Sequence, residues 1–72
     1  MTGELRIRFA DWVSEKEVSV AVGLIKMFAS TVQQDLERRT LTVVPNRGEL
    51  EVLKEYLAVW ETDKALCWTD AD

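Results

Sequence analysis

The sequence contains no histidine, a single cysteine, a single proline and three glycines in 72 residues. Without histidine the chain cannot build a Ser-His-Asp or Cys-His catalytic set or an HExxH zinc site, and one cysteine supplies no tetrahedral zinc pattern. Gly3, Gly23 and Gly48 are isolated from one another, so no glycine-rich loop is present to hold phosphates. We therefore expect no metal, no cofactor and no enzymatic activity.

Long apolar runs and targeting segments are also missing. No stretch approaches the roughly 18 apolar residues of a membrane span, and residues 1–4 lack the basic and apolar regions of a secretory signal. Cys67 has no second cysteine for an internal disulfide, which is typical of a reducing compartment. These features predict a cytoplasmic protein that does not enter a membrane.

Charge is unevenly distributed along the chain. Residues 1–47 contain seven basic and six acidic residues, whereas residues 48–72 contain two basic and seven acidic ones, so segment charges of +1 and −5 give the net charge of −4. Nucleic-acid affinity rests on bases that neutralise phosphates, so direct nucleic-acid binding is not expected. The acidic second segment instead favours a partner protein with a basic surface.

The chain length permits one domain, residues 1–72, with a small core. A domain of this size hides only about 60% of its chain surface, and one core of this kind rarely supplies more than about 3–5 kcal/mol. Small domains usually gain further stability from disulfides or structural metals, and neither is expected here. Association with another chain is the remaining source of stability, so we expect a homodimer.

The first half of the chain begins with a strand and a helix start. Apolar and basic residues alternate over 4–10, which predicts a half-buried strand. Ser14 and Glu17 have the spacing of a capping box at a helix N-terminus. An apolar row at helical spacing then predicts a helix over 14–38, and its members are Val18, Ala21, Val22, Ile25, Phe28, Ala29, Val32 and Leu36.

Two observations leave an alternative open for this region. Residues 18–24 also alternate, with valine at three positions, so a β-hairpin over 4–24 followed by a helix, a strand and a helix is the rival fold. A straight helix over 14–38 would span about 37 Å and overhang a domain roughly 30 Å across. Either the helix breaks near Gly23 or Ser30, or its far part packs on another chain.

The second half of the chain shows a strand, a turn and a helix. Residues 40–44 are β-branched and alternating, and Pro45 to Gly48 form the strongest turn signal. Asn46 is a candidate helix cap, and an apolar row predicts a helix over 47–61. Residues 65–69 form either a short third strand or an apolar tail. The pattern as a whole predicts an α+β fold, a small β-α-β-α unit with one long helix.

A second apolar row on the first helix predicts the dimer interface. It contains Val20, Leu24, Met27 and Thr31, which one small unit cannot easily cover in addition to its core row. A two-fold dimer through this helix would cover it.

The function hypothesis follows from these exclusions. We expect a small acidic protein-interaction module that docks on a partner protein as a regulator or inhibitor. Tryptophan is frequent among interface hot spots, so the candidate partner-binding residues combine two tryptophans with the acids of the second segment: Trp12, Trp68, Glu51, Glu55, Glu61 and Asp63. The alternative is a nucleic-acid mimic, whose helix acids occupy the basic channel of a DNA- or RNA-binding enzyme, as in inhibitors from phages and other mobile elements, including inhibitors of CRISPR complexes.

Overall fold

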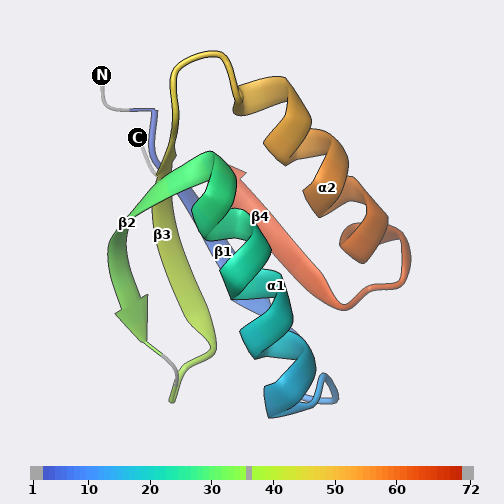
Figure 1. Cartoon of the computed structure of the whole chain (residues 1–72). Coiled ribbons are helices and arrows are strands. Elements are labelled where there is room, and N and C mark those ends of the chain that lie inside the picture. Colours follow the sequence, from blue (N-terminus) through green and yellow to red (C-terminus); the bar gives the residue numbers. More distant parts are fainter. Residues whose placement is uncertain (1–2, 36, 71–72) are drawn as a thin grey trace.

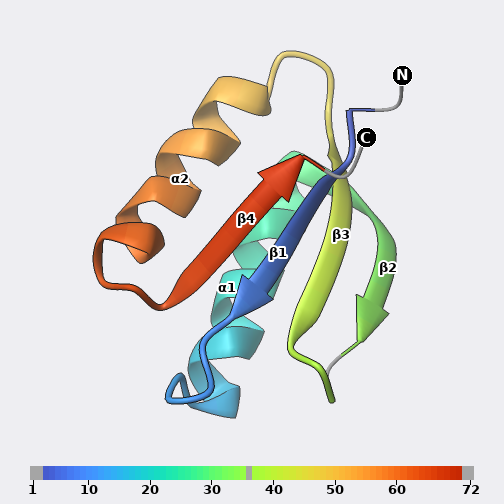
Figure 2. The same cartoon turned by 180° about the vertical axis from the view of Figure 1, so that it is seen from behind.

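The computed structural model describes residues 3–35 and 37–70 as two helices on one face of a four-stranded antiparallel sheet (Figures 1 and 2). Its class is α+β, as predicted. The elements in chain order are β1 (Leu5–Phe9), α1 (Glu15–Phe28), β2 (Ala29–Asp35), β3 (Thr40–Pro45), α2 (Leu50–Thr62) and β4 (Leu66–Asp70).

The strands lie in the order β2-β3-β1-β4, so β1 is central although it comes first in the chain. Each helix therefore crosses over one intervening strand, which is the split β-α-β arrangement of the ferredoxin-like topology. The sheet has two edges, β2 and β4, and its face opposite the helices is open (Figure 2). Arg6 and Arg8 of β1 lie on this open face and are exposed.

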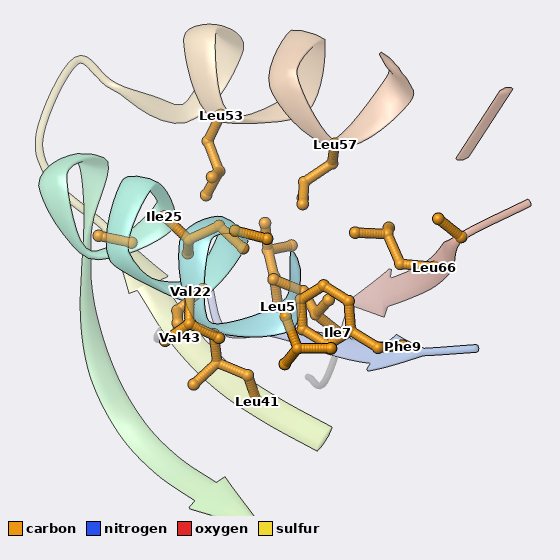
Figure 3. Packing of buried hydrophobic residues seen from close by; sticks show 14 of the residues in the cluster. Leu5, Ile7, Phe9, Val22, Ile25, Leu41, Val43, Leu53, Leu57 and Leu66 are labelled. Carbon is orange, nitrogen blue, oxygen red and sulfur yellow. The ribbon is translucent and has the colours of Figure 1, made fainter. Parts of the chain in front are cut away.

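The core lies between the helices and the sheet (Figure 3). In β1 the burial alternates strictly, with Leu5, Ile7 and Phe9 buried, as the period-two pattern predicts. Leu53 and Leu57 of α2 are fully buried and point at the sheet (Figure 3). The remaining core residues come from α1, β2, β3, β4 and the loops: Val13, Val18, Ala21, Val22, Ile25, Ala29, Leu41, Val43, Ala65 and Leu66.

The start of α1 confirms Ser14 as the helix cap, which is one half of the predicted capping box. Ser14 has an extended backbone, and its hydroxyl accepts a hydrogen bond from the Glu17 amide at 3.2 Å. Residues 17–24 lie within α1. The alternative hairpin over 4–24 is therefore wrong, because the periodicity of 3.6 outweighs the short valine alternation.

The predicted helix over 14–38 is too long. α1 ends at Phe28, Ala29 is its extended C-cap, and residues 29–35 form β2. The break falls beside Ser30, one of the two positions that the length argument favoured. The physical reason is strand pairing, since Ala29, Ser30 and Thr31 align with Pro45, Val44 and Val43 of β3. Leu36, the last member of the predicted helical row, lies outside the described residues.

The edge strand β2 contains a β-bulge. Thr31 aligns with Val43 and Gln33 with Thr42, so Val32 has no counterpart on β3. Val32 is exposed rather than packed in a helix. Thr31, predicted as part of a helical interface row, is a strand residue.

The second helix begins later than predicted, at Leu50, and ends at Thr62. Asn46 does not cap it: Glu49 is the N-cap residue and makes no side-chain cap hydrogen bond. The Asn46 backbone instead closes the turn, accepting from the Glu49 amide at 2.9 Å and donating to the Phe28 carbonyl at 2.8 Å. The chain end around residues 65–69 is a strand, β4, paired with β1.

Two glycine substitutions are expected to change stability in opposite directions. Gly23 lies inside α1 with open space around an added Cβ, so Gly23→Ala should raise the free energy of unfolding by about 0.5–1 kcal/mol. Gly48 also has open space, but its φ of +83° is unfavourable for other residues, so Gly48→Ala should lower the free energy of unfolding by about 1 kcal/mol. Urea denaturation measures the two changes, and a change of the same sign in both variants would contradict this explanation.

Candidate docking site

One end of the molecule brings together a tryptophan and several acids. Here the β1–α1 loop, residues 10–14, lies beside the α2–β4 loop, residues 63–65. The Ala10 amide donates to the Ala65 carbonyl at 2.8 Å and joins the two loops. We call this region, residues 10–17 and 61–65, the loop end.

Trp12 is held outward by its neighbours in the chain. The Val13 amide donates to the Ala10 carbonyl at 3.2 Å, so Asp11 and Trp12 are the central residues of a β-turn. Val13 is buried in the core, which anchors the end of the turn. The Trp12 side chain is consequently 64% exposed on a fixed backbone.

Arg39 ties this turn to the opposite loop. Its guanidinium Nη1 donates to the carbonyl oxygens of Ala10, at 3.1 Å, and of Val13. The Arg39 backbone carbonyl also accepts from the Phe9 amide at 2.9 Å. These bonds satisfy backbone groups at both ends of the turn and restrict its movement. Arg39 was not identified from the sequence, because its contacts join residues 26 and 29 positions apart.

The surroundings of Trp12 carry a small net negative charge. Within the loop end five acids and two lysines are exposed: Asp11, Glu15, Glu17, Glu61, Asp63, Lys16 and Lys64. The Arg39 guanidinium binds the turn, and Arg8 lines the adjoining cleft, so five acids face four basic residues and the local charge is −1. This cleft, of about 510 Å³, is lined by Asp11, Glu61, Arg8 and Lys64 and continues to the first residues of β4. Asp11 was not among the predicted partner-binding residues, although its place next to Trp12 in the sequence could have identified it.

The six predicted partner-binding residues do not form one surface in the structure. Trp12 lies in one of the two loops of the loop end, and Glu61 and Asp63 lie where α2 passes into the other, which Ala10 joins through its hydrogen bond to Ala65. Glu51 and Glu55 are exposed elsewhere, on the outward side of α2. The structure does not bring Trp68 to either group.

Trp68 is half-buried against the core from strand β4. The Lys54 ammonium lies 6.0 Å from the centroid of its ring, and the indole N–H is buried without a hydrogen-bond partner. This environment is that of a packing residue, which makes Trp68 a poorer anchor than Trp12.

A second hollow, of about 650 Å³, lies between α1 and the β2–β3 hairpin. Ser19, Gly23 and Lys26 of α1 face Gln34 of β2 across it. It exists because α1 leaves the inner side of β2 uncovered, where Thr31 and Gln34 are exposed. We call it the α1–β2 cleft.

The described residues contain neither a metal site nor a membrane-spanning helix. Within residues 3–35 and 37–70, no three metal-ligating side chains are grouped to hold an ion. Over those same ranges, neither helix has the length and apolar character needed to cross a membrane. No protein-family model, curated protein or solved structure matches the chain.

Proposed function

We propose that this protein is an interaction module that docks through its loop end on a basic surface of a partner protein, as a regulator or inhibitor without catalysis. The observation that carries the proposal is the exposed Trp12 on a turn fixed by Arg39, with exposed acids on both loops of this end. A large aromatic side chain entering an apolar pocket, with a polar rim, is the usual composition of an interface hot spot.

The fixed turn supports this function energetically. Binding costs conformational entropy for every side chain and loop that becomes ordered, so a loop already restrained by Arg39 loses less on docking. The exposed acids of the loop end also favour encounter with a positively charged surface. Trp12 thus supplies affinity and the acids supply orientation.

Nucleic-acid mimicry is the second candidate function. Its supporting observation is that Glu51 and Glu55 are exposed one turn apart on α2. A mimic would use these two acids, whereas the docking module would use Trp12. The two candidates therefore depend on different residues and can be separated.

Crosslinking tests the proposed function. A photo-crosslinking amino acid at position 12, expressed in the source cells, is expected to capture one partner, identified by mass spectrometry. The same amino acid at position 32 is the control, since Val32 is also exposed but lies on the far edge of the sheet. Equal products from both positions would contradict the proposal.

Binding of the purified partner gives the quantitative prediction. Trp12→Ala should weaken binding at least about tenfold, because truncating a central hot-spot residue costs more than about 1.4 kcal/mol. Glu51→Gln/Glu55→Gln should leave the affinity nearly unchanged. The reverse result, with competition by DNA or RNA, would favour mimicry.

A further inference from the structure

The outward side of α1 carries a row of large apolar residues. Val20, Leu24 and Met27 are exposed, and their spacing of four and three residues places them in one line. The flank with Ser19 and Lys26 faces the α1–β2 cleft. Leu24 lies about 140–160° around the helix from these two residues, so it lies on the flank of α1 toward α2, the helix beside it on the same face of the sheet (Figure 1).

The neighbouring flank of α2 continues this apolar surface. Lys54 lies over the ring of Trp68, so its flank of α2 faces β4. Val52 and Val59 lie about 140–160° around the helix from Lys54, on the flank toward α1. Both are exposed. The helical-face patch therefore spans both helices and consists of Val20, Leu24, Met27, Val52 and Val59.

Charges of opposite sign border the helical-face patch. On the α2 side Glu51 and Glu55 are exposed. On the other side Lys26 faces the α1–β2 cleft and Lys16 lies in the first turn of α1 beside Glu15, so that these three residues are net positive. A two-fold rotation about an axis along α1 exchanges the two sides. Each copy would then place its glutamates opposite the lysines of the other copy.

We propose that the helical-face patch binds a second copy of this chain, with the two α1 helices packed on each other around a two-fold axis parallel to them. About this axis the apolar row of α1 meets its own copy and the two charged sides exchange, so the α1 surface is self-complementary, as an isologous interface requires. This interface is separate from the loop end, so each protomer keeps its Trp12 free to dock on a partner.

The lengths of the two helices limit the area that this dimer interface can bury. α1 has 14 residues and α2 has 13, which makes each about 20 Å long, and two adjacent helices present a face about 20 Å wide. Such a footprint belongs to the small interfaces, below about 1,200 Å² in total. A reversible dimer with a dissociation constant in the micromolar range is therefore expected.

Sedimentation equilibrium over a range of concentrations tests the dimer. The wild-type chain should pass from monomer to dimer, and Val20→Glu should raise the dissociation constant at least about tenfold by placing a charge in the apolar seam. Val32→Glu is the matched control, because Val20 and Val32 are 54% and 53% exposed. Val32→Glu should dimerise like the wild type. Circular dichroism verifies that both variants fold.

A charge swap tests the orientation of the two copies. Glu55→Lys and Lys26→Glu should each weaken the dimer, and the double variant should recover wild-type association, because the exchanged charges again oppose each other. A double variant weaker than both single variants would overturn this arrangement. A wild-type chain that remains monomeric at millimolar concentration, or equal loss in the two valine variants, would overturn the dimer itself. Neither result bears on crosslinking from position 12.

Discussion

Leu57→Ala is expected to leave the protein largely unfolded at room temperature. Leu57 is fully buried where α2 packs over the sheet (Figure 3). Removing a buried leucine side chain costs about 2.7–5 kcal/mol, from lost burial and from the cavity that remains. A core of this size supplies only about 3–5 kcal/mol of net stability in the first place. This one substitution therefore removes most of the free energy of unfolding.

Far-ultraviolet circular dichroism and urea denaturation, at a protein concentration well below the dissociation constant of the dimer, measure this effect without contribution from association. The control is Val59→Ala, which removes apolar atoms from the same helix at a position that is 65% exposed. It should change the free energy of unfolding by less than about 0.5 kcal/mol. Comparable losses in the two variants would mean that α2 does not pack as described.

Arg39→Met is expected to lower the free energy of unfolding by about 2 kcal/mol. The substitution keeps an apolar stem but removes the guanidinium that donates to the carbonyls of Ala10 and Val13. Hydrogen bonds from charged donors contribute about 1.5–3 kcal/mol. The Val13 carbonyl loses its bond to the guanidinium, whereas the Ala10 carbonyl keeps its bond from the Val13 amide. The residue at position 39 keeps the same unfavourable positive φ of 57°, so backbone strain does not confound the comparison.

The adjacent arginine provides the control. Arg38 contacts Asp35 at 3.8 Å, with the Arg38 side chain 83% exposed, and such surface pairs contribute only about 0–1 kcal/mol. Arg38→Met should therefore be nearly neutral in urea denaturation. Hydrogen exchange at the Val13 amide should increase in the Arg39 variant alone, because the Val13 amide closes the turn that contains Trp12. Equal exchange and equal stability of the two variants would show that Arg39 does not anchor this turn.

Much of the fold could be predicted because local signals and burial agree. The alternation over Leu5, Ile7 and Phe9 matches the buried side of β1, and the Ser14 and Glu17 spacing marks the true start of α1. The error lies at β2. Ala29 and Val32 fit a helical row, and only pairing with β3 across the chain decides that they form a strand, which a local pattern does not contain.

The candidate site was predictable only in part for the same reason. Trp12 was identified because tryptophan is frequent among interface hot spots, and the same ground selected Trp68. The sequence could not separate Glu61 and Asp63 from Glu51 and Glu55, since all four lie in one acidic segment. Their separation depends on where α2 ends relative to the β1–α1 loop. Trp68 follows the buried side of β4, opposite Ile7, which required the register with β1.

The irregularity at Val32 has a consequence for behaviour in concentrated solution. A regular outer strand is a template on which further strands can add without limit, and one unmatched residue breaks the repeat that such growth needs. Strands of other molecules therefore cannot extend the sheet regularly from β2. At high concentration this edge disfavours the growth of fibres and leaves closed assemblies of defined size as the favoured form of association.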